Sequence, residues 1–478
     1  MRKNTVIMLL YQVAMYLVPL ITMPYVSRVL GARGLGVFSY TSSVMSFCIV
    51  FATMGVAIYG KREIASCLTK EDRTNVFWSI FITESFMFIF VLVGYILYNV
   101  FINTAYKTAS YLQIMALIGA WLDISWLFFG VENFKLAIVR NVLIRLLSLF
   151  AIFVFIKKNT DENLYVFIIT LSDIVSVVPL WLLLNKYISK LNFSNLSIRK
   201  RLLPMLKMQF TAVLTNIYVI SDKIILGLYA PISLVGIYDN AFKLSKVAVS
   251  IITVIGIVML PRMTHMFAQG SDKSMGYFKK TLNLTMFVGT GCCFGIIAIS
   301  PTFMPLYLGT EFNDSIIVTQ ILSLVLLFVA WGNVFRSQYI IPQKMDGLYI
   351  KSVMIASIIN VILNLLLIPK FSIYAAAISY LITEISISVY QTYKVRNYFC
   401  IIALLLSNCV YLISAFSMML IIFIVRSIMS ELLPNILSLL MQFLFGSIFY
   451  LLFSCYLERK INNRVVDVEL LYVLRKIF

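Results

Sequence analysis

Seven basic side chains lie within or at the ends of strongly apolar segments of this chain. A charged side chain at the centre of a membrane span costs about 2.5–3.5 kcal/mol, so such residues tend to face a water-filled cavity. The seven are Arg28, Arg33, Arg140, Arg145, Lys223, Lys243 and Lys246. Against these seven bases we count three acids in the same or other apolar segments: Asp123, Asp222 and Asp239. A multivalent anion would stabilise this surplus of cations, and guanidinium groups suit the geometry of phosphate particularly well.

Two of these segments present polar groups along one helix face. Gln209, Asn216 and Lys223 follow one another at a spacing of seven residues, which predicts a polar stripe about 21 Å long. The next segment carries three charged residues at i, i+4 and i+7: Asp239, Lys243 and Lys246. We interpret both stripes, Gln209 and Asn216 included, as candidate walls of a substrate-binding cavity.

Local charge pairing is the alternative to a ligand site. Asp222 could pair with Lys223, and Asp239 with Lys243, while the other bases extend to the membrane interface. Further acids in apolar segments could bind a coupling proton or sodium ion, or could instead make an interhelical hydrogen bond. The candidates for ion coupling or charge pairing are Asp123, Asp222, Asp239, Glu84, Asp173 and Glu384.

The sequence gives no sign of a catalytic, metal or cofactor site. His265 is the single histidine, and the seven cysteines are scattered without the spacing of metal ligands. The phosphate-binding motif G-x-x-x-x-G-K-[ST] does not occur, so we expect no ATP hydrolysis by this polypeptide. We therefore predict a non-enzyme with no cofactor and no metal.

The composition indicates an integral membrane protein. Of the 478 residues, 61% are hydrophobic and 12% are charged, whereas soluble domains carry about 25% charged residues. A window of about 19 residues predicts an all-α bundle of about fourteen transmembrane helices. We place them near residues 5–30, 36–60, 77–101, 108–131, 136–156, 163–185, 205–230, 236–261, 280–303, 315–340, 348–369, 372–393, 400–425 and 434–456.

The basic residues predict the orientation of these helices. With the N-terminus in the cytoplasm, about 26 of the 39 Lys and Arg fall in or beside cytoplasmic segments, as the positive-inside rule requires. An even number of spans returns the C-terminus to the same side. This topology accounts for the net charge of +19, so we expect no nucleic-acid partner.

The chain also contains an internal echo at an offset of about 200 residues. Residues 11–31 ("YQVAMYLVPLITMPYVSRVLG") and residues 208–227 ("MQFTAVLTNIYVISDKIILG") share a glutamine, a base and a glycine in the same order, and G-[VI]-[FY] follows at Gly36 and Gly236. A second echo pairs "WLDISW" from Trp121 with "WGNVFR" from Trp331. Two six-helix halves related by an axis along the membrane normal are a standard transporter layout.

Three stretches resemble a known family: "PLITMPYVSRVLGARGLGVFSY", "WLDISWLFFGVENFK" and "SDKIILGLYAPISLVGIYDNAFKL". They are similar to the polysaccharide transporter family of bacterial flippases, the Wzx-type carriers of O-antigen, capsule and exopolysaccharide repeat units, within the superfamily that also holds multidrug antiporters. The resemblance implies a V-shaped bundle of two pseudo-symmetric six-helix lobes plus two C-terminal helices. It further implies alternating access that moves an undecaprenyl-pyrophosphate-linked oligosaccharide from the inner to the outer leaflet of the bacterial plasma membrane.

Carried onto this chain, the family's cationic cavity would include Arg28 and Lys223, with Arg33, Arg140, Arg145 and Lys243 as further members. The implied partners are the lipid-linked glycan, membrane lipids, a polysaccharide polymerase and a chain-length regulator, and we expect a monomer. The glycines Gly31, Gly34 and Gly36 would permit a tight turn between the first two spans.

Two other functions remain open. One is a cation-coupled small-molecule antiporter of the same superfamily, which would favour a carboxylate-dominated site. The other is a polytopic polysaccharide polymerase, for which the outer loops are too short to carry a catalytic site. The expected division is 1–185 for the first lobe, 186–204 for a basic cytoplasmic linker, 205–393 for the second lobe, and 394–478 for the last two helices and a cytoplasmic tail.

Overall fold

The computed structural model describes residues 2–102, 105–189, 198–269, 273–432 and 434–461. All the regular secondary structure within these ranges is helical. Twelve helical stretches among the described residues are long and apolar enough to cross a membrane. The predicted all-α, multi-pass membrane protein is therefore confirmed.

Residue contacts divide the chain into two compact units, Met1–Asp239 and Asn240–Phe478. The first unit contains α1 (Arg2–Ala52), α2 (Val56–Ala65), α3 (Lys70–Phe101), α4 (Lys107–Trp121), α5 (Ser125–Gly130), α6 (Phe134–Phe155), α7 (Glu162–Leu183) and α8 (Ile198–Tyr229). Helix α9 (Ile232–Ala268) begins in the first unit and ends in the second. The second unit continues with α10 (Lys273–Leu308), α11 (Ser315–Phe335), α12 (Asp346–Val395), α13 (Ile401–Leu432) and α14 (Asn435–Ile461).

The expected lobes and the 186–204 linker stay a prediction. Residues 190–197 of that linker lie outside the described residues, and α8 already begins at Ile198. Its first turns carry Lys200 and Arg201. Because about 20 residues suffice to cross a bilayer, a helix of 32 residues can carry these charges beyond the hydrocarbon region.

Two long helices each contain a bend that separates two expected spans. In α1 the backbone leaves helical geometry at Gly31 (φ 67°, ψ −177°), and in α12 it does so at Ser372 (φ 51°, ψ −126°). Glycine has no Cβ and adopts a positive φ at little cost. The bend at Gly31 falls between the spans expected at 5–30 and 36–60. Counting each bent helix twice reconciles twelve helical stretches of the described chain with about fourteen expected spans.

Both tryptophan echoes precede an irregular stretch of helix. After Trp121 the chain leaves the helix at 122–124, and the Asp123 carboxylate accepts a hydrogen bond (2.9 Å) from the backbone N–H of Ser125 at the start of α5. A few residues after Trp331, α11 continues as a wider π-type turn over Arg336–Ile340. The two motifs thus share a departure from α-geometry as well as a sequence pattern.

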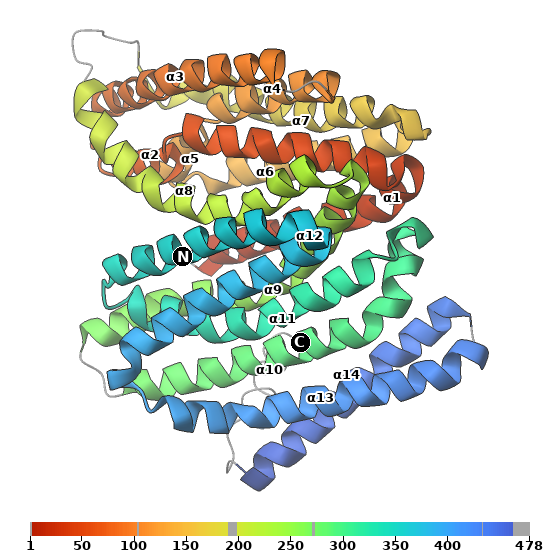
Figure 1. Cartoon of the computed structure of the whole chain (residues 1–478). Coiled ribbons are helices and arrows are strands. Elements are labelled where there is room, and N and C mark those ends of the chain that lie inside the picture. The colour runs from red at the N-terminus through yellow and green to blue at the C-terminus, as the bar shows by residue number, and fades with distance from the viewer. Residues whose placement is uncertain (1, 103–104, 190–197, 270–272, 433, 462–478) are drawn as a thin grey trace. The chain divides into compact units, whose positions relative to one another are not determined.

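Aromatic packing forms the core of the first unit. Phe77 of α3 stacks on Trp126 of α5 with ring centroids 5.4 Å apart, and Phe88 stacks on Trp121 at 4.5 Å. Helix α4 packs against both α1 and α7, and Figure 1 shows α3, α4 and α7 running side by side. Helix α6, which carries Arg140 and Arg145, packs against α1 and α7.

Polar contacts join α14 to α10 in the second unit. The hydroxyls of Thr290 and Tyr450 lie 2.9 Å apart, and the Gln442 amide donates to the Thr302 hydroxyl at 3.3 Å. In Figure 1, α13 and α14 run alongside α10. Because lipid tails are as apolar as leucine, small and polar contacts of this kind hold membrane helices together.

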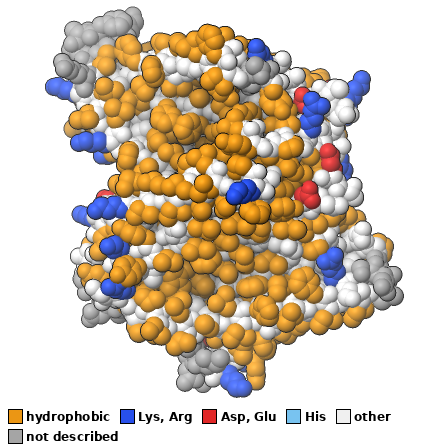
Figure 2. Space-filling model, viewed as in Figure 1, with side chains coloured by type: hydrophobic (Ala, Val, Ile, Leu, Met, Phe, Trp, Pro, Cys, Tyr) orange, Lys and Arg blue, Asp and Glu red, His pale blue; other side chains and the backbone are white. Residues whose placement is uncertain are grey.

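The surface is mostly apolar. Figure 2 shows hydrophobic side chains covering most of the visible face, with most Lys and Arg gathered toward the helix ends. Large side chains such as Phe90 (74% exposed) and Leu406 (65% exposed) lie on the outside. Exposed apolar area on this scale fits contact with lipid.

Candidate functional site

A cluster of charged and polar residues joins α1, α8 and α9 within the first unit. The Lys223 Nζ of α8 lies 2.5 Å from Oδ1 of Asp239 on α9. The Ser39 hydroxyl of α1 donates to the other oxygen of Asp239 at 2.6 Å. One residue earlier on both helices, the Tyr238 hydroxyl donates to Asp222 at 2.8 Å. We call these five residues the charge cluster.

The charge cluster is almost entirely removed from solvent. Asp222 and Asp239 are 0% and 1% exposed, and the Lys223 side chain is 16% exposed. Each acid has a polar partner, as a buried carboxylate requires. The ion pair holds the Lys223 ammonium group in a defined position inside the helix bundle.

The charge cluster adjoins a close crossing of α1 and α9. A Cβ added to Gly36 would overlap the carbonyl group of Ile232, and one added to Gly236 would lie 2.7 Å from the backbone N of Gly36 and overlap the carbonyl oxygen of Ala32. Real Cβ atoms essentially never come this close to another heavy atom. The two helices therefore meet backbone to backbone, and only glycine fits at both positions.

The crossing brings the two echo motifs together reciprocally. Position 36 meets position 232, and position 236 meets position 32. Ser39 and Asp239, which hydrogen-bond to each other, are separated by 200 residues. Positions 36 and 236 are equivalent in the two motifs, and so are positions 32 and 232. When two equivalent pairs make the same contact in exchanged roles, the two segments are related by a two-fold axis. The offset of about 200 predicted from the sequence matches this geometry.

The two arginines of α6 pair with acids on neighbouring elements. Arg140, which is 6% exposed, lies 3.2 Å from Asp123 and also donates to the carbonyl oxygen of Ser176. Arg145 lies 3.4 Å from Asp173 on α7. These pairs connect α6 to α7 and to the break between α4 and α5. Any anion that used these guanidinium groups would compete with a carboxylate.

Arg28 and Arg33 lie on either side of the Gly31 bend in α1, and both are exposed. Two of the other candidates, Gln209 and Asn216, donate hydrogen bonds to backbone carbonyl oxygens. The Gln209 amide donates to the carbonyl oxygen of Val50 on α1, and the Asn216 amide donates to Ala212 of its own helix at 2.9 Å. Gln209 thus joins α8 to α1, while Asn216 stays half-buried on α8.

A separate group of polar residues lies in the second unit. Lys246 of α9 contacts the Tyr380 hydroxyl of α12 at 2.7 Å, and its ammonium group lies 5.1 Å from the ring centres of Phe242 and Tyr380. The Tyr380 hydroxyl also donates to Glu384 at 3.2 Å. Lys243 is half-buried on the same helix as Lys246. The structure thus assembles a Lys246–Tyr380–Glu384 chain that the sequence did not indicate.

Glu84 has the most isolated carboxyl group among the candidate acids. It lies on α3, is 2% exposed, and its Oε2 has no hydrogen-bond partner among the residues that the structure describes. An acid inside a membrane bundle is a candidate for binding a proton or a cation. Its neighbour Ser85 accepts a hydrogen bond from Trp121 at 2.9 Å, which ties this part of α3 to α4.

The sequence did not indicate Ser39, Tyr238 and Tyr380, which act through their hydroxyl groups, or Ser176, which acts through its backbone carbonyl oxygen. Hydroxyl residues are common in membrane helices, and any residue can offer a backbone carbonyl oxygen. The echo could have indicated Ser39, because it occupies the position equivalent to Asp239. The roles of all candidate residues in substrate binding or ion coupling stay predictions.

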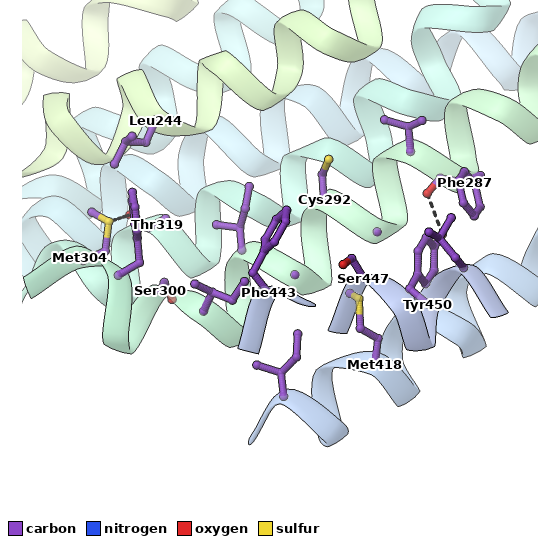
Figure 3. A pocket seen from close by; sticks show the side chains of 18 residues that line it. Leu244, Phe287, Cys292, Ser300, Met304, Thr319, Met418, Phe443, Ser447 and Tyr450 are labelled. Carbon is purple, nitrogen blue, oxygen red and sulfur yellow. Dashed lines mark hydrogen bonds between the residues drawn. The ribbon is translucent and has the colours of Figure 1, made fainter. Parts of the chain in front are cut away.

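An apolar cavity of about 550 Å³ lies between α10 and the α13–α14 pair. Figure 3 shows Phe287, Met418, Phe443 and Tyr450 among its labelled side chains, and the Tyr450 hydroxyl donates to the backbone oxygen of Phe287 at 2.7 Å. Its lining carries no charged side chain among the described residues. This cavity suits apolar groups and is chemically unlike the charge cluster.

Comparison with known proteins gives a consistent result. Residues 1–267 match the sequence profile of a family described as "Polysaccharide biosynthesis protein". A "Putative O-antigen transporter" of Escherichia coli (strain K12) is 22% identical over 402 residues, which cover 83% of this chain and 97% of that protein. The capsular polysaccharide biosynthesis protein CapF of Staphylococcus aureus is 24% identical over 274 residues, which cover 55% of this chain and 68% of CapF.

A solved structure has the same fold. The lipid II flippase MurJ, in an inward closed conformation, aligns with a TM-score of 0.74 at 15% identity, over 95% of this chain and 99% of that one. At this identity the likeness concerns the fold alone. The resemblance identified in the sequence is confirmed by the family profile and by the relatives.

Proposed function

Since this chain belongs to the polysaccharide biosynthesis protein family, we propose that it is a flippase for a lipid-linked glycan. Its cargo is an undecaprenyl-pyrophosphate-linked oligosaccharide repeat unit, moved from the inner to the outer leaflet of the bacterial plasma membrane for O-antigen, capsule or exopolysaccharide assembly. The similarity to a protein named for O-antigen transport, over 83% of this chain and 97% of that one, carries the proposal. A polymerase and a chain-length regulator then act on the delivered unit.

Basic side chains inside the membrane support a pyrophosphate-bearing cargo. Arg28 lies exposed on α1, three residues before the Gly31 bend, and Lys223 is held in place by Asp239. A pyrophosphate offers several anionic oxygens, which an arginine can bind in bidentate fashion. In the proposal Arg28 makes this contact, and Lys223 supplies a second, positioned cation.

In the proposal the α1–α9 crossing is the contact that forms and breaks during the transport cycle. The positive-inside topology puts the Gly31 bend and the α8–α9 turn on the outer side, with both termini in the cytoplasm. In the proposal, contact at Gly36 and Gly236 seals the outer end, and separation of these helices opens it. The ion pair and hydrogen bond of Asp239 stabilise the sealed state.

Substitution of Arg28 by alanine should lower the flipping rate by about tenfold to a hundredfold. A hydrogen bond to a charged group contributes about 1.5–3 kcal/mol, and Arg28→Ala removes such contacts with the pyrophosphate. Arg28→Lys should restore only part of the rate, because lysine keeps the charge but loses the planar fork. The assay is a purified protein in proteoliposomes with a defined lipid-linked oligosaccharide, in which the fraction reaching the opposite leaflet is measured.

Lys107, an exposed base at the start of α4, provides the matched control. Lys107→Ala should flip at the unmodified rate. Full activity of Arg28→Ala would show that this arginine is an interface anchor and has no role in binding. Failure of the unmodified protein to move any lipid-linked glycan would contradict the proposed function itself.

Flipping should depend on the membrane potential. Moving about two negative charges outward across about 100 mV releases about 5 kcal/mol, because one charge contributes about 2.3 kcal/mol per 100 mV. Arg28 and Lys223 lie on the protein and move little as the cargo crosses, so net negative charge leaves the cytoplasmic side. A potassium–valinomycin potential, inside negative, should raise the initial outward rate severalfold without a pH or sodium gradient.

The same vesicles with equal potassium on both sides are the control. An initial flipping rate that does not change with the membrane potential would contradict electrogenic transport. It would favour electroneutral exchange of the cargo for a cation, with Glu84, Asp173 and Glu384 as the acids to substitute next.

A further inference from the structure

A cavity of about 490 Å³ lies where the first turns of α10 and α13 meet in the second unit. Lys279 and Lys280 of α10 line it, both exposed, and Asn283 lies one turn further along the same helix. Tyr398 and Ser407 add hydroxyl groups. The described residues that line the cavity include no Asp or Glu. The wall is therefore positively charged and rich in hydrogen-bond donors.

The start of α13 adds to this positive character. Helix α13 begins at Ile401, and Cys400, just before it, lines the cavity. The first N–H groups of a helix have no acceptor within the helix, and the helix dipole favours an anion at this end. Two ammonium groups, an amide and a helix N-terminus thus surround one space. This donor set fits phosphate oxygens.

The length of α10 allows the cavity to lie at the membrane interface. Helix α10 has 36 residues, whereas about 20 residues suffice to cross the hydrocarbon core. Its first turns, which carry Lys279 and Lys280, can therefore lie among the phospholipid headgroups. On α13, Ile402 (72% exposed) and Leu406 (65% exposed) face outward beside the cavity. An anion bound here would have an apolar surface next to it.

The other side of α13 has a related arrangement. A second cavity of about 540 Å³ is lined by Trp331, Leu405 and Leu412, and it includes Arg396. The Arg396 guanidinium lies 3.8 Å from the ring centre of Tyr393. Both cavities thus combine an apolar wall with a cation close to the start of α13. A molecule with an anionic head and apolar tails matches this combination, whereas a free anion matches only its charged part.

We propose that Lys279 and Lys280 bind the phosphate of an anionic phospholipid, whose chains lie along the apolar surface of α13. The bound headgroup links α10 to the start of α13 and so helps to hold the α13–α14 pair in place. This lipid is a resident of the site and is distinct from the transported cargo. The inference does not depend on what the protein transports.

Binding can be measured on the purified full-length chain in detergent. Phosphatidylglycerol is titrated in, and native mass spectrometry counts the lipids retained. We expect Lys279→Gln/Lys280→Gln to weaken binding about thirtyfold, which corresponds to about 2 kcal/mol, because a lysine near an anionic surface contributes about 1 kcal/mol. Lys279→Arg/Lys280→Arg should retain phosphatidylglycerol at nearly the unmodified affinity. Both lysines are exposed, so these substitutions leave the packed core unchanged.

Lys61→Gln/Arg62→Gln is the matched control, because it also removes two adjacent exposed bases, predicted on the same side of the membrane. It should retain phosphatidylglycerol like the unmodified chain. Equal binding of phosphatidylcholine, or equal weakening by the Lys61/Arg62 variant, would overturn the site in favour of general surface attraction. Displacement of the lipid by millimolar inorganic phosphate alone would instead indicate a site for a soluble anion and would overturn the lipid assignment.

Discussion

Replacing Lys223 by alanine is expected to lower the free energy of unfolding by about 3–5 kcal/mol. The substitution leaves Asp239, which is 1% exposed, without the ammonium group that lies 2.5 Å away. Removing one partner of a buried ion pair leaves an uncompensated buried charge, which is costly. Titration with a denaturing detergent in mixed micelles, followed by intrinsic fluorescence, would measure the change.

Two further variants separate stability from transport. Lys207→Ala removes an exposed lysine from the same helix and should change the unfolding free energy by less than about 0.5 kcal/mol. Lys223→Met/Asp239→Asn removes both charges while keeping an acceptor for Ser39, so it should regain most of the lost stability. We expect this double variant to fold and yet to flip poorly. If it flips normally, Lys223 contributes only to stability and does not bind the cargo.

The second large effect is expected at the helix crossing. Gly36→Val should abolish flipping or prevent accumulation of folded protein, because a Cβ at this position overlaps the carbonyl group of Ile232. Backbone atoms cannot move aside as a flexible side chain can, so α1 and α9 would have to separate. Overpacking of ordinary cores costs about 1–3 kcal/mol, and a clash with backbone exceeds that range. Size-exclusion chromatography of the purified variant and the flipping assay together measure the result.

Gly94 provides a matched control, because nothing lies within 4 Å of a Cβ added there. Gly94→Ala should fold and flip normally, and alanine favours helix by up to about 1 kcal/mol over glycine. Gly236→Val should behave like Gly36→Val, because the crossing is reciprocal. Normal flipping by either valine variant would show that the crossing does not have to form during transport.

Hydropathy in a window of about 19 residues, together with composition, was sufficient to predict the class and nearly all of the spans. A helix that crosses a bilayer needs about 20 mostly apolar residues, whichever apolar residues they are. Each span therefore gives its own hydropathy signal in the sequence. The bend at Gly31 also had a local signal in the glycines that surround it. The bend at Ser372 had none, because a non-glycine residue at φ 51° is uncommon and depends on its surroundings.

The sequence could predict that buried charges form ion pairs, but it could not predict which residues pair with each other. As the alternative to a ligand site, the sequence suggested Asp222 as a partner for Lys223 and Lys243 as a partner for Asp239, whereas the structure pairs Lys223 with Asp239 across α8 and α9. Adjacent residues on a helix point in different directions and do not face each other. Partner choice therefore depends on which helices pack together. Arg140 with Asp123 and Arg145 with Asp173 illustrate the same limit.

The reciprocal crossing has a consequence for the history of the chain. If both echo motifs descend from one duplicated segment, two identical copies of the ancestral half would have met at this axis, where positions on the axis, such as 39 and 239, face their own equivalents. Glycine fits such a symmetric pair, because both equivalent positions, 36 and 236, carry glycine. Ser39 facing Asp239 does not, because two facing aspartates would repel and two serines would leave Lys223 without its acid. The ion pair at this axis would then have arisen only after the sequences of the two halves had diverged.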